Sequence, residues 1–181
     1  MRMPGLYHAP TEFRLSPMEA NLFLGEPPPL ALEAARTIYA AAFGRPPYNE
    51  GPEQADAFVS RIHRYASERD GVRLVLVKEA AIGLAVLARP GDWWRDRAAE
   101  AAGPAQIGDL CLEVVHLAVH PGRQGQGWGK LAHDLLIAGS PAPRALLTCD
   151  PRAAPAQALY RSRGWTPLAK LGTSDLMARD L

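Results

Sequence analysis

This sequence has few cysteines, no long apolar run and no recognisable targeting pattern. Two of its 181 residues are cysteines, Cys111 and Cys149. They lack Cys-x-x-Cys spacing, so neither a disulfide framework nor a zinc site is indicated. No segment approaches the roughly 20 apolar residues that a membrane-spanning helix needs, and residues 1–10 lack the basic patch and apolar run of a signal peptide. We therefore expect a cytoplasmic protein with no membrane partner and no metal.

The sequence also has no marked excess of either positive or negative charge. The chain has 20 Lys and Arg residues against 19 Asp and Glu residues, which gives a formal net charge of +1, and it has no dense basic run. Nucleic acid is therefore not expected as a partner. A hydrophobic content of 48% and a charged content of 22% are typical of a globular protein. The length suits one domain over residues 1–181, with an N-terminal arm and first strand in residues 1–29.

Hydrophobic periodicity and turn residues predict the order of the elements. Apolar residues at helical spacing predict helices over residues 29–44, 52–70, 128–138 and 153–163. Short apolar stretches predict strands over residues 72–78, 81–88, 110–119, 144–149, 165–168 and 175–179, of which the first two form an antiparallel hairpin. An earlier edge strand is predicted at either 13–15 or 22–24, and residues 89–109 are predicted as a long irregular segment. This order indicates one mixed sheet with helices on both faces.

A glycine-rich segment, Gln124-Gly125-Gln126-Gly127-Trp128-Gly129, joins the strand over 110–119 to the next helix. Glycines followed by a helix N-terminus collect unpaired N–H groups, which is typical of a phosphate site. A nucleoside triphosphate loop needs Ser or Thr where this chain has Leu131. A dinucleotide fingerprint needs a third glycine where this chain has Lys130. What remains is the spacing Gln-x-x-Gly-x-Gly, filled by Gln124, Gly127 and Gly129.

This spacing resembles the coenzyme A pyrophosphate loop of the GNAT superfamily of N-acetyltransferases, and further landmarks of that family lie between residues 110 and 168. Residues 113–121, Glu-Val-Val-His-Leu-Ala-Val-His-Pro, are similar to the family's fourth strand, which splays from its neighbour. Residues 156–165 resemble the family's Ala-x-x-Leu-Tyr-x-x-x-Gly-Phe signature, with Trp165 in place of the phenylalanine. One departure is Ala153, where many relatives carry asparagine, so that side chain's contact to the cofactor is not expected here.

The resemblance implies an α/β fold with a single mixed, mostly antiparallel sheet of six to seven strands flanked by about four helices. It also implies a coenzyme A-binding core over about 110–168, and transfer of an acetyl group from acetyl-CoA, as cosubstrate, to a primary amine of a small molecule or peptide. The residues that it assigns to the cofactor are Leu117, Ala118, Val119, Gln124, Gly125, Gln126, Gly127, Trp128, Gly129 and Lys130. The alternative is a non-catalytic acyl-CoA-binding or regulatory module.

Acyl transfer to an amine requires a base for the ammonium and an acid for the departing thiolate. The resemblance implies Glu113 as the base, sometimes through water, and Tyr160 as the acid. Burial in an apolar strand face would raise the pKa of Glu113 toward a useful value, whereas a solvated or arginine-paired carboxylate is the competing interpretation. His116 is the competing base, and strand alternation predicts that it faces away from Glu113.

Two aromatic segments are candidates for the acceptor side. Tyr48 lies in the loop over 46–50, and Trp93 and Trp94 lie in the segment 89–109; their order along the chain is similar to that of the acceptor-side segments of the family. Together with Glu50 or Asp92, these aromatic residues would suit a cationic amine, although exposed tryptophans also anchor dimers. The sequence leaves open both the identity of the acceptor amine and the formation of a homodimer.

Overall fold

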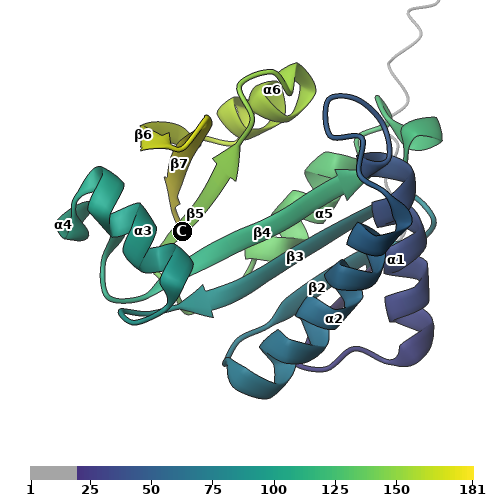
Figure 1. The fold of residues 1–181 in the computed structure, drawn as a ribbon, viewed down its shortest axis with the longest axis horizontal. Coiled ribbons are helices and arrows are strands. Elements are labelled where there is room, and N and C mark those ends of the chain that lie inside the picture. The colour runs from purple at the N-terminus through teal and green to yellow at the C-terminus, as the bar shows by residue number, and fades with distance from the viewer. Residues whose placement is uncertain (1–19) are drawn as a thin grey trace, which may run out of the picture.

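A seven-stranded mixed sheet organises the protein, whose computed structural model describes residues 20–181. The strands lie in the order β1-β2-β3-β4-β5-β7-β6, and every neighbouring pair is antiparallel except β4 and β5. The predicted mixed, mostly antiparallel sheet is therefore confirmed (Figure 1). The strands are β1 Ala20–Leu24, β2 Arg73–Val77, β3 Ala81–Ala88, β4 Cys111–Val119, β5 Arg144–Cys149, β6 Thr166–Leu171 and β7 Ser174–Asp180.

Helices cover both faces of this sheet. α1 and α2 pack side by side on one face, and α5 packs on the other (Figure 1). A proline opens α1, α2 and α4, and another lies in the first turn of α6; its fixed φ suits a helix start, where its missing donor is not needed. The helices are α1 Pro29–Phe43, α2 Pro52–Glu68, α3 Trp93–Ala102, α4 Pro104–Ile107, α5 Trp128–Ile137 and α6 Ala154–Ser162, with a 3₁₀ turn at Pro121–Arg123.

The hydrophobic core forms two layers because residues of β2 and β3 alternate between the faces of the sheet. Leu74, Ile82 and Leu84 are fully buried against α1 and α2. Val75 and Ala85 are buried in the other layer, which α5 covers. Burial of a large apolar side chain contributes about 1.5–3 kcal/mol, so the central strands form a stable platform for the residues at their ends.

The segment 89–109 differs from its prediction, because it forms α3 and the short α4 rather than an irregular loop. Alanine has the highest helix propensity, and Ala98 and Ala99 of α3 are buried against the sheet. The glycines and prolines of this segment mark the ends of the two helices. At the other end of the chain, the alternative at 22–24 is confirmed as part of β1, whereas the alternative at 13–15 lies outside the described residues.

A β-bulge in β4 changes which side chains share a face. Leu84 of β3 lies opposite His116, and the next residue, Ala85, lies opposite Val114, so Val115 is an extra residue without a partner. A bulge shifts the alternation of a strand by one residue. Glu113 and His116 consequently both face α2 and its end, and the prediction that they lie on opposite faces is wrong.

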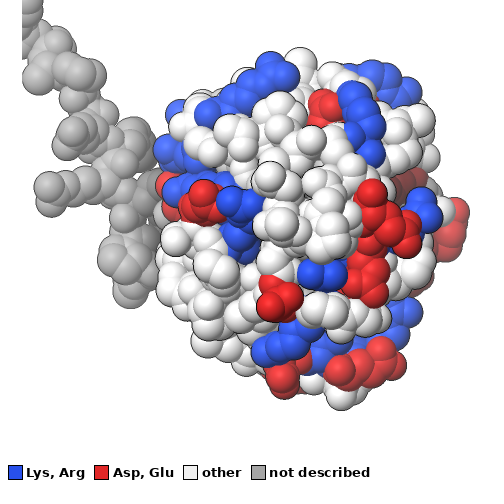
Figure 2. All heavy atoms as spheres, turned by 90° about the vertical axis from the view of Figure 1, so that its left-hand side faces the viewer, with Lys and Arg blue, Asp and Glu red and all other residues white. Residues whose placement is uncertain are grey.

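The surface formed around α3 and α4 carries both signs of charge. Basic and acidic side chains are intermixed there around an area without charged side chains (Figure 2). Within residues 20–181, no helix combines the length and apolar character needed to cross a membrane. Charge therefore does not single out a binding face on this side, and the candidate site is found from cavities and backbone geometry.

Candidate functional site

The site is built where the two parallel strands separate. Among the described residues, β4 and β5 pair only at Leu112 with Ala145 and at Glu113 with Leu146. Beyond these pairs the two strands diverge and open a cleft of about 670 Å³. The cleft is lined by three segments of the chain, which are the α1–α2 connection (Ala42, Phe43, Pro46, Pro47, Tyr48), the β4–α5 region (Leu117, Ala118, Val119, Arg123, Gln124, Gly125, Gly127, Trp128, Gly129, Lys130) and the α6 region (Arg152, Ala153, Pro155, Ala156, Ala158, Leu159, Tyr160, Ser162).

The glycine loop gives one end of the cleft a geometry and charge that suit an anion. Gly125 and Gly127 have φ values of +77° and +86°, a conformation that glycine adopts without the strain of a side chain. Within the described part of the chain, no side chain caps the N-terminus of α5 and no acidic residue lies in its first turn. Unpaired N–H groups and the positive end of the helix dipole therefore face this end of the cleft. Arg123 and Lys130 add positive charge to its lining.

Gly129 allows α5 to approach β4 and α6 closely. A Cβ atom at this position would lie 3.1 Å from Cγ2 of Val119 and 3.2 Å from Cδ1 of Leu159. Both distances are tighter than an ordinary van der Waals contact between carbon atoms. The motif thus combines two glycines that set the loop conformation with a third that sets the helix position.

Nine of the ten residues assigned to the cofactor line the cleft; the exception is Gln126. The Oε1 atom of Gln126 instead accepts a hydrogen bond of 3.1 Å from Nε1 of Trp128. Gln126 therefore holds the indole at the start of α5 and does not itself form the wall of the cleft. The departure at Ala153 also lies in the wall, where a methyl group takes the place of a longer polar side chain.

Tyr160 of α6 lines the same cleft and is 7% exposed. Burial raises the pKa of its phenol above the ordinary value, so the hydroxyl is protonated at neutral pH and is able to donate a proton. Its ring packs against Trp165, with ring centroids 5.7 Å apart. Nε1 of Trp165 in turn donates a hydrogen bond of 2.8 Å to Nε2 of His133 in α5. The tryptophan that replaces the family's phenylalanine thus ties the position of Tyr160 to α5.

Glu113 lies on β4 but does not line the cleft. It is 4% exposed, and its Oε2 atom lies 3.4 Å from Nη1 of Arg69 at the end of α2. Burial raises the pKa of Glu113 to about 6, although the charge of Arg69 opposes this shift. The carboxylate is therefore both buried, as the base hypothesis requires, and paired with an arginine, as the competing interpretation requires.

His116 is held as a neutral side chain. Its Nε2 atom lies 2.9 Å from Nη1 of Arg61, and since a guanidinium can only donate, Nε2 accepts. Its ring makes edge contacts with Tyr39 and Phe58, with centroids 5.2 and 5.5 Å away. Burial and the charge of Arg61 lower its pKa to about 3. A histidine whose lone pair is occupied and whose pKa is this low is poorly suited to accept a proton at neutral pH.

The residues predicted for the acceptor side lie in two different places in the structure. Tyr48 lines the cleft and is 41% exposed, and its ring lies edge-on to Phe43, with centroids 4.9 Å apart. Trp93 and Trp94 instead lie at the start of α3 and do not line the cleft. Trp93 is 76% exposed, and Trp94 packs against the core beneath α3.

Neither acidic candidate lines the cleft. Oε2 of Glu50 accepts a hydrogen bond of 2.6 Å from the Tyr39 hydroxyl, and Asp92 pairs with Arg69 at 3.0 Å. The expectation of an acidic acceptor pocket made by Glu50 or Asp92 is therefore not met. Four residues in or beside the site were not predicted from the sequence, because their contacts join distant parts of the chain: Phe43, Arg61, Arg69 and Arg152. The aromatic spacing of Phe43 and Tyr48 was the one signal that the sequence offered for any of them.

Known proteins share this sequence pattern and fold. The sequence model of the acetyltransferase (GNAT) family matches residues 32–165. Among solved structures, PH1933 from Pyrococcus horikoshii OT3 is 18% identical with a TM-score of 0.65, covering 90% of this chain and 99% of that one. A GNAT family acetyltransferase from Brucella melitensis in complex with acetyl-CoA is 16% identical, with a TM-score of 0.53 and coverage of 90% of each chain. Arabidopsis thaliana NAA60 in complex with acetyl-CoA is 13% identical, with a TM-score of 0.58, covering 90% of this chain and 99% of that one.

No curated protein sequence matches this chain. The family match nevertheless spans most of the sequence, from α1 to the end of α6, and it includes the glycine loop and the Tyr160 signature. The chain therefore belongs to the GNAT family of acetyltransferases. It has the family's fold and is an acyltransferase.

Proposed function

We propose that the protein transfers an acetyl group from acetyl-CoA directly to a primary amine, with both substrates bound at once. The observation that carries this proposal is the cleft itself, where the glycine loop, the separated half of β4 and Tyr160 meet. The Brucella melitensis and Arabidopsis thaliana structures each hold acetyl-CoA, which supports the same cosubstrate here. The pyrophosphate would lie against the backbone N–H groups from Gly125 to Lys130.

The chemistry divides between β4 and α6. The backbone at Leu117 polarises the thioester carbonyl and stabilises the oxyanion that forms when the amine nitrogen attacks. Glu113 takes the proton of the acceptor ammonium through water, since it is buried behind the cleft rather than in its wall. When the carbon–sulfur bond breaks, Tyr160 donates its proton to the departing thiolate, and the second proton of the attacking nitrogen passes to the Tyr160 phenolate. Glu113 returns its proton to water, and the neutral amide and free coenzyme A are the products.

The acceptor side is formed by Tyr48 together with Phe43. Both rings lie in the wall of the cleft, and the charged side chains in that wall are the cations Arg123, Lys130 and Arg152. Such a lining favours an amine carried on an apolar or aromatic group over a polyamine. Among the structural neighbours, one is a mosquito arylalkylamine N-acetyltransferase like 5b and another is a NatC complex bound to a Gag peptide and CoA, so both small amines and peptide N-termini belong in a substrate panel.

Release of free thiol from acetyl-CoA, measured against a panel of arylalkylamines, alkylamines and peptides, tests the proposal. Wild type should release thiol with at least one amine, and Glu113→Gln and Tyr160→Phe should each lower kcat by about 100-fold or more. Glu100→Gln, an exposed glutamate on α3, is the control and should leave the rate unchanged. Equal rates in all variants would contradict the assigned roles. Binding of acetyl-CoA without thiol release from any amine would favour the non-catalytic module.

A further inference from the structure

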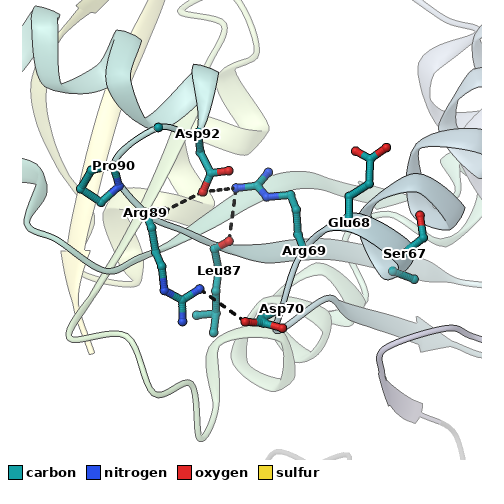
Figure 3. A pocket seen from close by; sticks show the side chains of 10 residues that line it. Ser67, Glu68, Arg69, Asp70, Leu87, Arg89, Pro90 and Asp92 are labelled. Carbon is teal, nitrogen blue, oxygen red and sulfur yellow. Dashed lines mark hydrogen bonds and ion pairs between the residues drawn. The ribbon is translucent and has the colours of Figure 1, made fainter.

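A second cavity lies behind the candidate base. It has a volume of about 360 Å³ and lies between the C-terminal end of α2 and the segment that joins β3 to α3 (Figure 3). None of its lining residues also lines the cleft. Its charged lining consists of Glu68, Arg69, Asp70, Arg89 and Asp92. Arg69 stands out among them, because it alone of these five contacts Glu113.

Four contacts fix the Arg69 guanidinium. Its Nη2 atom lies 3.0 Å from Oδ2 of Asp92 and donates to the Leu87 carbonyl at 3.2 Å, as the dashed lines of Figure 3 show. Its Nη1 atom donates to Oε2 of Glu113 at 3.4 Å. The ring of Tyr65 lies 5.1 Å from its Cζ atom, a cation–π distance. A flexible arginine held on this many sides is a fixed positive charge rather than a mobile surface group.

The surroundings of Glu113 contain charges of both signs. Arg69 at the end of α2 and Arg61 within α2 favour the ionised carboxylate, whereas Asp92, from the β3–α3 connection, disfavours it. Cys111, on the same strand, also lies close enough to interact with Glu113, and burial raises the pKa of its thiol to about 12. It is therefore uncharged at neutral pH. The charged groups that face Glu113 are thus two arginines and one aspartate.

We propose that Arg69 is a positioning residue for Glu113, and that Asp92 and the Leu87 carbonyl hold it in that role. Arg69 orients one carboxylate oxygen of Glu113 and balances its buried charge. Asp92 shares the guanidinium with Glu113 and so moderates this effect. This inference rests on the proposed function, in which Glu113 takes the proton of the acceptor amine.

A purely structural ion pair and a positioning pair predict different results when each partner is removed. Loss of Arg69 leaves a buried carboxylate facing Asp92, which should keep Glu113 protonated to higher pH. Loss of the Asp92 charge leaves Arg69 to interact with Glu113 alone, which should ionise Glu113 at lower pH. If Arg69 instead only ties the end of α2 to Leu87 and Asp92, both variants should weaken the fold and leave the proton affinity of Glu113 unchanged.

Carbon-13 NMR titration of protein labelled at the glutamate carboxyl groups measures this directly, with the Glu113 resonance assigned by its absence in Glu113→Gln. Arg69→Met should raise the midpoint by at least about one pH unit, and Asp92→Asn should lower it. Arg89→Gln is the matched control, since Arg89 lines the same cavity and pairs with Asp70 rather than with Glu113. An unchanged midpoint in both Arg69→Met and Asp92→Asn would overturn the proposal.

The pH profile of kcat/KM for thiol release connects this titration to catalysis. Its acid limb should move in the same direction as the NMR midpoint in each variant, and Arg69→Lys should restore most of the wild-type profile. If the acid limb stays in place while the midpoint moves, Arg69 still sets the proton affinity of Glu113, but Glu113 is not the base of the reaction, and that part of the proposed function fails. If wild type releases no thiol with any amine, the proposed function fails, and the opposite NMR shifts alone decide whether Arg69 positions Glu113. Should Arg69→Met not fold, Asp92→Asn provides the test alone: a lower Glu113 midpoint supports the proposal, and an unchanged midpoint overturns it.

Discussion

Glu113 lies in an environment that favours its protonated form more than water does. Its side chain is almost fully buried, and burial outweighs the charge of Arg69, so its pKa rises from 4.5 to about 6. A carboxylate with a pKa near neutrality is suited to accept a proton and release it again within one catalytic cycle. The same shift also links Glu113 to the stability of the fold.

The stability of the protein should therefore depend on the ionisation of Glu113. Between pH 4.5 and about 6 the folded state binds more protons at this site than the unfolded state does. The contribution of Glu113 to the free energy of unfolding is thus present below pH 4.5 and is lost as pH rises through 6, by about 2 kcal/mol. Urea unfolding across this range should show the loss in wild type but not in Glu113→Gln. Parallel curves for the two proteins would contradict a buried Glu113 with a raised pKa.

The surroundings of single residues were the hardest part of the site to predict. The sequence indicates that Glu113 is buried in a strand, but Arg69 lies 44 residues earlier and no motif connects them. His116 shows a second limit, because alternation along a strand predicts the opposite face. The bulge at Val115 depends on the pairing with β3, which the sequence of β4 alone does not contain.

At the scale of elements, α5 and the loop before it act as one unit. Gly127 is the N-cap of α5, and its left-handed conformation turns the chain so that the first N–H groups of the helix point toward the cleft. Gly139 follows α5 at its other end and also has a positive φ, of +64°. A Cβ atom at either position would meet open space, so the two glycines are matched in strain and differ in their distance from the cleft.

Gly127→Ala and Gly139→Ala should separate stability from cofactor binding. Each places alanine in a left-handed conformation and should lower the free energy of unfolding by about 1–2 kcal/mol. Gly127→Ala should also weaken acetyl-CoA binding by about tenfold or more, because the strained loop shifts the N–H groups that would hold the pyrophosphate. Calorimetry and urea unfolding of both variants measure the two effects. Equal affinity for acetyl-CoA in the two variants would contradict the role of the loop.

Most elements were predictable because their sequences carry local signals. Prolines at helix starts, glycines at helix ends and short apolar stretches predicted α1, α2, α5, α6 and the strands of the sheet. α3 was missed because glycines and prolines on both sides of it resemble a long loop, whereas its alanines and the burial of Ala98 favour a helix. Trp93 and Trp94 were assigned to the acceptor side from their order along the chain, but they lie at the start of this helix and do not line the cleft.

At the scale of the whole molecule, the cleft follows from strand order. β4 and β5 are the one parallel pair among the described strands, and they separate after two paired positions. This separation leaves Leu117, Ala118 and Val119 in the wall of the cleft beside the glycine loop, and α6 adds Tyr160 to the same lining. The family resemblance indicated this arrangement from the sequence, but the path of the α1–α2 connection over the cleft is a property of the folded chain.

Binding of acetyl-CoA to the cleft is the central claim, and isothermal titration calorimetry tests it most directly. Wild type at micromolar concentration should bind one acetyl-CoA per chain, and prior saturation with coenzyme A should abolish the heat, because both ligands share the pyrophosphate that the loop would hold. A titration of wild type that releases or absorbs no heat of binding at this concentration, at two temperatures, would contradict the account.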